Sequence, residues 1–161
     1  MKLKRFPQGD EITPRIGKGQ FASVYAVSDT HAAKVYDWPY FPGKYLRDMQ
    51  EEYQNTLAAY EAGISVPKPE GIFKVKIRWF KTLFGLFFPE RTAFVMEWIK
   101  GERADKTDGN LHRRVRDLFD KEVEKCERLG FFSGDFRLNN AIYSPERDKL
   151  YLIDLADCGR E

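Results

Sequence analysis

Cysteine and histidine are scarce in this sequence. Its 161 residues include two cysteines, Cys126 and Cys158, and two histidines, His31 and His112. None of these side chains stands at a spacing typical of zinc ligands, so we expect no zinc site. The two cysteines do not make the framework of a small disulfide-stabilised domain, and we therefore expect a reducing, cytoplasmic setting.

Long apolar runs and an excess of one charge are also missing. The longest strongly apolar run covers residues 83–88, whereas a membrane-spanning helix needs about 20 apolar residues. No apolar stretch follows the basic start of the chain, so we expect no secretory leader. Lysine and arginine number 27 against 25 aspartates and glutamates, a net charge of +2, and we expect no nucleic-acid partner.

Hydrophobic patterns predict an α+β protein. With 42% hydrophobic and 15% aromatic residues, the chain can bury one ordinary core, and we expect a single domain over residues 1–161. Period-two alternation predicts strands, and apolar residues every three or four positions predict helices. The strands are expected on either side of a glycine turn within 16–27 and over 31–36, 71–80, 92–98, 141–143 and 150–153. The helices are expected over 45–62 and 111–129, and residues 1–12, 37–43, 100–110 and 131–140 are expected to be irregular.

Three features suited to ligand binding or catalysis follow one another in the first half of the chain. Gly17 and Gly19 precede the alternating residues around Val24, and glycines let backbone N–H groups approach a polyphosphate, although most glycine pairs are ordinary hairpin turns. Lys34, flanked by apolar residues on an expected strand, either faces water or holds phosphate oxygens. On a helical wheel Glu52 falls at the edge of the apolar stripe, where it is either a partner of Lys34 or a solvated charge.

The second half carries polar residues at the ends of apolar segments. Within the expected loop, the Asp135 carboxylate can accept a proton from a hydroxyl, and the Asn140 amide oxygen can ligate Mg²⁺. Arg137 lies between them and can neutralise a transferring phosphoryl group. Asp154 ends an apolar strand, where a carboxylate is costly to bury unless it binds a cation or a donor. A metal ion between phosphates is the partner that we expect for Asp154.

In their order along the chain, these features resemble the protein-kinase-like superfamily. The sequence is most similar to its compact atypical branches, the RIO and tRNA-modification-associated kinases and the bacterial kinases of lipopolysaccharide core sugars. Those branches favour Gly-Asp in the catalytic loop, as at residues 134–135, and a helix ending in Ala-Gly-Ile-x-Val-Pro, as at residues 62–67. The resemblance implies a minimal two-lobed fold, with a strand-rich N-lobe over about 12–98 and a truncated helical C-lobe over about 101–161.

The resemblance implies a role for each candidate residue. The implied catalytic residues are Asp135, which would accept the proton, Arg137, which would face the γ-phosphate, and Lys34, which would hold the α- and β-phosphates. Asn140 and Asp154 are implied to hold Mg²⁺. The residues implied to surround ATP are Gly17, Gly19, Val24, Ala32, Lys34, Glu52, Glu97 and Trp98, the last two in a hinge.

The sequence departs from the kinase pattern at several positions. Ala22 replaces the third glycine, Ser133 replaces the histidine before Gly-Asp, and residues 154–156 read Asp-Leu-Ala in place of Asp-Phe-Gly. Only residues 155–161 follow Asp154, so we expect no activation segment and no docking helices for a peptide. A C-lobe this short implies a partner protein or a homodimer that completes it.

Three functions follow from these observations. The first is an ATP- and Mg²⁺-dependent kinase whose hydroxyl acceptor is either a lipopolysaccharide core sugar or a protein Ser/Thr. The alternative is a nucleotide-binding, pseudokinase-like regulator that acts through a partner, and a plain α+β scaffold without nucleotide binding ranks far below both. The aromatic stretch 79–89 is either a hairpin buried in the N-lobe or an exposed tip that contacts a membrane, which would place the protein at the inner membrane face.

Overall fold

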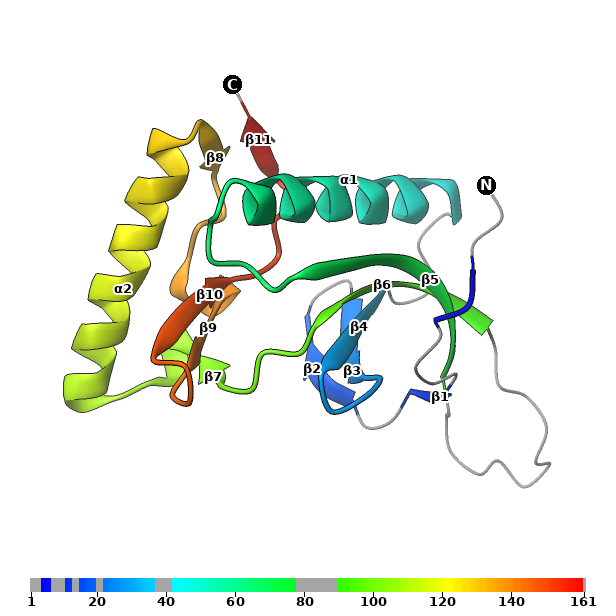
Figure 1. Ribbon diagram of the computed structural model, residues 1–161, viewed down its shortest axis with the longest axis horizontal. Coiled ribbons are helices and arrows are strands. Elements are labelled where there is room, and N and C mark those ends of the chain that lie inside the picture. The colour runs from blue at the N-terminus through cyan, green and yellow to red at the C-terminus, as the bar shows by residue number, and fades with distance from the viewer. Residues whose placement is uncertain are drawn as a thin grey trace. The chain divides into compact units, whose positions relative to one another are not determined.

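The structure is a computed structural model that describes residues 4–6, 11–12, 15–19, 22–36, 42–77 and 90–160. The chain divides into two compact units (Figure 1). Unit 1 consists of Met1–Gln50 and Pro69–Trp98, and unit 2 consists of Glu51–Lys68 and Ile99–Glu161. The aromatic stretch 79–89 lies outside the described residues, so both of its interpretations stay open.

Unit 1 is built on a six-stranded sheet in the order β1-β5-β6-β4-β3-β2 (Figure 1). β1 (Glu11–Ile12) pairs in parallel with β5 (Pro69–Ile77), and every other neighbouring pair is antiparallel. The remaining strands are β6 (Glu90–Glu97), β4 (His31–Tyr36), β3 (Ala22–Ala26) and β2 (Arg15–Lys18). These strands confirm the predicted ones, with shifted ends. The expectation that residues 1–12 are irregular is wrong at β1, because a strand of two residues is too short to show alternation.

One face of this sheet forms the core of unit 1. Ala33 and Val35 of β4, together with Ala93 and Val95 of β6, are almost completely buried there. The other side chains of this core are Phe6, Tyr25, Val27 and Val75, with Phe73 packed against them. Successive strand residues point to opposite faces. The even-numbered residues of β3, β4 and β6 therefore share the face opposite to this core.

Helix α1 (Pro42–Glu61) confirms the predicted first helix but begins earlier than expected. Proline suits the first position of a helix, where its missing N–H has no partner to lose. The expected loop over 37–43 is therefore wrong at its end. After the helix, Gly63 adopts a left-handed conformation with φ of +79°, and two backbone hydrogen bonds of 2.9 and 3.0 Å close the helical end. The chain passes from unit 1 to unit 2 within α1.

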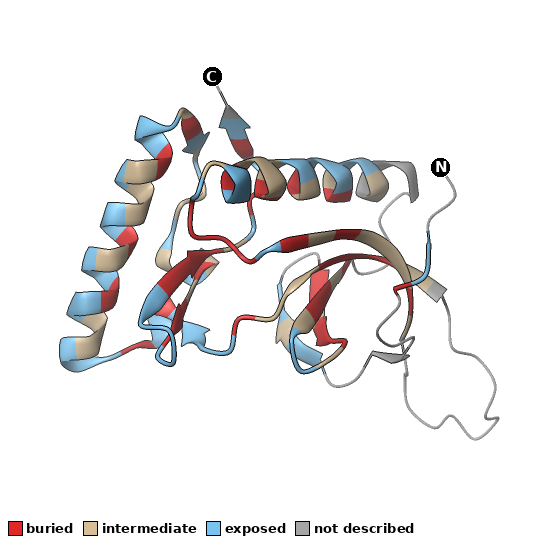
Figure 2. Cartoon of the chain, viewed as in Figure 1, coloured by how far each residue is buried: buried red, intermediate tan, exposed pale blue. Residues whose placement is uncertain are grey.

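Unit 2 contains helix α2 (Gly109–Arg128) and a three-stranded sheet in the order β10-β9-β7. α2 buries Val115, Phe119 and Cys126 along one side and exposes the other side to solvent (Figure 2). Its neighbours include β10 (Lys149–Leu152) and the 3-10 helix η1 (Ala104–Lys106). α2 and the hairpin of β9 (Ala141–Ser144) with β10 confirm the predictions for this half of the chain. Among the described residues, no helix combines the length and the hydrophobicity that a membrane crossing requires.

Short strands in unit 2 escape the sequence prediction. The expected loop over 131–140 begins instead with β8 (Phe131–Ser133), which pairs antiparallel with β11 (Cys158–Arg160). The expected connector over 100–110 likewise includes β7 (Glu102–Arg103), which pairs with β9. Strands of two or three residues carry no readable periodicity, and these two form because distant segments supply their partners. The loop then continues into the 3-10 helix η2 (Leu138–Asn140).

Candidate active site

Lys34 lies on the face of the unit 1 sheet that is opposite to the core. It pairs with Val24 of β3 on one side and with Phe94 of β6 on the other. Residues directly opposite each other on antiparallel strands point to the same face, so these three side chains form one row. Gly17 of β2 extends the row, because it pairs with Val24. The row thus brings together Gly17, Val24 and Lys34, three of the residues assigned to the ATP site.

Ala32 lies in the next row of the same face, one step closer to the end of β6. It pairs with Ala26 of β3 and with Met96 of β6, and both alanines are buried. Glu97 and Trp98 follow Met96 directly along the chain. One face of the sheet therefore leads from Lys34 past Ala32 to the segment expected to be the hinge. That Ala32 and this hinge contact adenine stays a prediction.

The glycine turn between β2 and β3 is closed by a backbone hydrogen bond from the Gly19 N–H to the Ala22 carbonyl, at 2.8 Å. A Cβ added at Gly17 would meet Val24 at an ordinary 3.6 Å, and one added at Gly19 would lie 3.4 Å from the Ala22 oxygen. Neither glycine has a positive φ. The described residues thus leave room for a small side chain at both positions, and the approach of a polyphosphate to this turn stays a prediction.

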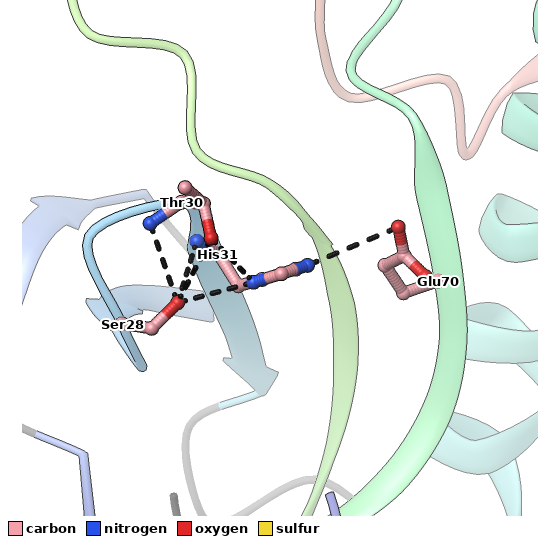
Figure 3. Close-up of polar contacts among 4 residues, drawn as sticks. All are labelled: Ser28, Thr30, His31 and Glu70. Atoms are coloured by element: carbon pink, nitrogen blue, oxygen red, sulfur yellow. Dashed lines mark hydrogen bonds and ion pairs between the residues drawn. The ribbon is translucent and has the colours of Figure 1, made fainter. Parts of the chain in front are cut away.

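A polar cluster fixes the turn between β3 and β4 next to the hinge segment (Figure 3). His31 Nδ1 lies 3.1 Å from Ser28 Oγ and 2.9 Å from Thr30 Oγ1, while His31 Nε2 lies 3.9 Å from a carboxylate oxygen of Glu70 on β5. The Thr30 carbonyl accepts a hydrogen bond of 2.8 Å from the Trp98 N–H. The cluster therefore holds the backbone at Trp98, in the segment predicted to be the hinge, from within unit 1. Nothing in the composition indicated this role for His31.

Asp135 is held by three neighbours in unit 2. Its N–H donates to the hydroxyl of Ser133 at 3.0 Å, so Ser133 supports the loop. The Asn140 side-chain amide donates to the Asp135 carbonyl at 3.1 Å and to its carboxylate at 2.7 Å. The guanidinium Nε of Arg137 lies 3.0 Å from the other carboxylate oxygen. The Asp135 side chain is nevertheless 38% exposed, so a solvent-borne hydroxyl can reach it.

Asp154 is exposed and adopts a left-handed backbone with φ of 62°, which is uncommon for a residue other than glycine and concentrates at functional sites. Hydrogen bonds hold the backbone of the residues on both sides of Asp154. The Ile153 N–H donates to the Asn140 carbonyl at 2.9 Å, and the Leu155 carbonyl accepts from the side-chain amide of Asn55 at 3.0 Å. Asp154 is thereby fixed next to the Asp135 loop.

Ser65 is a supporting residue that sequence analysis missed. Its N–H donates to the Glu122 carboxylate of α2 at 2.6 Å, and its carbonyl accepts from the Leu152 N–H at 2.8 Å, two residues before Asp154. Lys125 of α2 also donates to the Gly63 carbonyl. The only sequence signal is the Ala-Gly-Ile-x-Val-Pro motif around Ser65, which predicts an extended linker but not these contacts.

The oxygens of Asn140 and Asp154 fit the chemistry of a Mg²⁺ site. The side-chain NH₂ group of Asn140 donates its hydrogen bonds to Asp135, which leaves the side-chain oxygen, Oδ1, able to ligate a metal ion. Carboxylate and amide oxygens are the ligands that Mg²⁺ prefers, with phosphate oxygens and water completing the shell. In the described part of the chain, no three His, Cys, Asp or Glu side chains gather as a ligand set. A cation at this place would therefore depend on a bound phosphate.

Glu52 is buried in α1, with 2% exposure, whereas its neighbour Glu51 is exposed. The burial of Glu52 contradicts its interpretation as a solvated charge and agrees with its place at the edge of the apolar stripe. A buried carboxylate needs polar partners, and across the described residues every buried side-chain nitrogen or oxygen has a hydrogen-bond partner. Glu52 belongs to unit 2 and Lys34 to unit 1. Their pairing, like the roles of the other candidate residues, stays a prediction.

Neither a protein-family model nor a curated protein matches the sequence. Among solved structures, the chain is similar to the crystal structure of a Stt7 homolog from Micromonas algae soaked with ATP, with a TM-score of 0.66 and 15% identity. The similarity covers 98% of this chain and 54% of that chain, so this chain spans about half the length of the protein that it matches. At this identity the similarity shows the fold alone. The mixed α/β architecture, with its strand-rich sheet and two long helices, is compatible with a small kinase-like fold.

Proposed function

We propose that the protein is an ATP-dependent phosphotransferase that moves the γ-phosphate to a hydroxyl acceptor. The observation that carries this proposal is the linked arrangement of Asp135, Asn140 and Asp154. The side-chain amide of Asn140 donates a hydrogen bond to the Asp135 carboxylate, and the backbone carbonyl of Asn140 accepts one from the N–H of Ile153, the residue before Asp154. These hydrogen bonds hold Asp135, the proposed proton acceptor, close to Asn140 and Asp154, whose side-chain oxygens are suited to Mg²⁺. The similarity in fold to a protein soaked with ATP supports a nucleoside triphosphate as the phosphate donor.

In the proposed reaction, the Asp135 carboxylate orients the acceptor hydroxyl and accepts its proton. The acceptor oxygen forms a bond to the γ-phosphorus, and the bond from that phosphorus to the bridging β–γ oxygen breaks, which releases ADP. Arg137 supplies positive charge to the transferring group. Mg²⁺ held by Asn140 and Asp154 would neutralise phosphate charge. Lys34, braced by Glu52, would hold the α- and β-phosphates.

The acceptor remains one of two classes, a glycan hydroxyl such as that of a lipopolysaccharide core sugar, or a protein Ser/Thr. We place the reaction in the cytoplasm, with contact to the inner membrane face through residues 79–89 as a further proposal. We further propose that a second copy or a partner protein contributes to the acceptor-binding surface. The second candidate function is a nucleotide-binding regulator without turnover.

The test uses purified protein, γ-labelled ATP, Mg²⁺ and cell extract divided into protein, lipid-linked glycan and small-molecule fractions. The Asp135→Ala variant serves as the matched control. Label that enters one fraction, and is absent with Asp135→Ala, supports the phosphotransferase and identifies its acceptor class. An absence of label together with thermal stabilisation by ATP supports the regulator. An absence of both contradicts nucleotide binding altogether.

A further inference from the structure

A shallow pocket lies in unit 2 beside Asp135, at the C-terminal end of α2. Its volume is about 210 Å³, and it is lined by Glu127, Phe132, Ser133, Gly134 and Phe136. Three of these residues directly precede Asp135 and one directly follows it, so the pocket and the proposed proton acceptor share one stretch of chain. Pockets for drug-sized ligands measure about 300–1,000 Å³. This pocket is too small for a nucleotide and matches a single side chain or a small head group.

Glu127 gives the pocket its charge. The residue is exposed, and among the described residues its carboxylate makes neither an ion pair nor a side-chain hydrogen bond. It lies in the last turn of α2, where the helix dipole disfavours a negative charge. The nearby Lys125 does not compensate it, because its ammonium is bound to the Gly63 carbonyl and to Glu122. Arg128, the other basic residue in the last turn, makes no ion pair with Glu127, so the described residues leave the Glu127 carboxylate without an ion-pair partner at the pocket.

Two aromatic rings complete the pocket. Phe132 is 44% exposed, which is unusual for a large apolar side chain, and Phe136 is half-buried. An aromatic face attracts a cation, and the aliphatic stem of a lysine or arginine packs well on such a ring. A carboxylate beside two rings selects for a cation with an apolar stem, because an anion would be repelled and a neutral group would leave Glu127 without a partner.

We propose that this pocket binds an ammonium or guanidinium group of the acceptor, so that the protein prefers acceptors with a positive charge near the reacting hydroxyl. This inference rests on the proposed phosphotransferase function in naming the acceptor, but the binding of a cation does not depend on it. The cation can belong to a lysine or arginine side chain or to an amino sugar, and the experiment distinguishes these sources.

The first measurement tests binding without turnover. Backbone amide NMR of the full chain is recorded during titration with n-butylammonium, methylguanidinium, n-butanol and butyrate. We expect saturable shifts at residues 132–136 with both cations, weakened at least about fivefold by Glu127→Gln. Glu124→Gln is the matched control, since Glu124 is exposed on the same helix but does not line the pocket, and it should leave the binding unchanged. Equal binding of butanol and butylammonium would overturn the proposal.

The second measurement compares phosphate transfer to matched acceptors. One pair consists of Ser peptides with arginine or glutamine beside the serine, and the other consists of glucosamine and glucose. We expect kcat/KM to favour the cationic member of one pair by about five- to tenfold through KM, and this preference to vanish in Glu127→Gln. The pair that responds identifies the source of the cation. Transfer without preference overturns the pocket proposal alone, whereas cation binding without transfer in any fraction contradicts the phosphotransferase alone.

Discussion

Gly101 marks the place in unit 2 where the fold has no room for a side chain. It directly precedes β7, which pairs with β9 through Glu102 opposite Tyr143. A Cβ added to Gly101 would lie 2.8 Å from the carbonyl carbon of Tyr143 and still closer to its oxygen, although real Cβ atoms essentially never come within 3.0 Å of another atom. The obstacle is backbone, which cannot rotate away. Gly101→Ala must therefore push β7 away from β9.

The cost of this displacement can be worked out from the contacts that it disturbs. The two-residue pairing of β7 with β9 loses hydrogen bonds that contribute about 1 kcal/mol each. Ala104, which follows β7 and is completely buried, shifts in the core of unit 2, and such repacking costs about 1–3 kcal/mol. We expect Gly101→Ala to lower the free energy of unfolding by about 3 kcal/mol and Tm by roughly 6–12 °C.

Urea denaturation followed by circular dichroism measures this loss. The matched control is Gly159→Ala in β11, where an added Cβ would have no neighbour closer than 3.9 Å, and we expect a change within about 0.5 kcal/mol. If Gly101→Ala is as stable as the wild type, the inference that Gly101 packs directly against the Tyr143 backbone is wrong.

Three more predictions concern the candidate site and the buried thiol. Asn140→Ala removes the bonds of 3.1 and 2.7 Å to Asp135 and should lower kcat of phosphate transfer by at least about 100-fold, measured with labelled ATP, while the circular dichroism spectrum stays native. Gly19→Ala should leave Tm unchanged, because its Cβ meets only an ordinary contact, but should weaken ATP binding about tenfold in calorimetry; unchanged affinity would contradict a phosphate contact at this turn. Burial raises the pKa of Cys126 from its usual 9.0 to about 12, so the unfolded chain loses this proton first as pH rises. Between these values the stability of the wild type should fall relative to Cys126→Ala by about 1.4 kcal/mol per pH unit, and equal pH slopes for the two proteins would refute the assignment.

The long elements were predictable from the sequence because their periodicity is strong. The apolar stripes of α1 and α2 and the alternation in β5 each extend over several repeats, and local pattern dominates in such segments. β8 and β11 were not predictable, since each has three residues and exists only through pairing with a segment far along the chain. Length, rather than residue type, separates the two groups.

The candidate site was predictable only in part. Asp135 and Asn140 were predicted because they follow a glycine turn, a strand lysine and a helix glutamate in the order typical of the protein-kinase-like superfamily. The supporting contacts of Ser65 and His31 were not predictable, because a backbone hydrogen bond or a turn contact leaves almost no trace in residue type. Glu127 was hidden for a different reason, since one glutamate among many on a charged helix is distinguished only by the rings beside it.

The left-handed backbone at Asp154 means that folding stability and the proposed cation binding favour different residues at this position. An L-residue in this conformation costs roughly 1–2 kcal/mol relative to glycine, so Asp154→Gly would relax the backbone and remove the carboxylate that the proposed Mg²⁺ site needs. A selection for thermal stability alone would therefore tend to replace Asp154, whereas a selection for cation binding would keep it. The residue present at this position is the one that folding favours less.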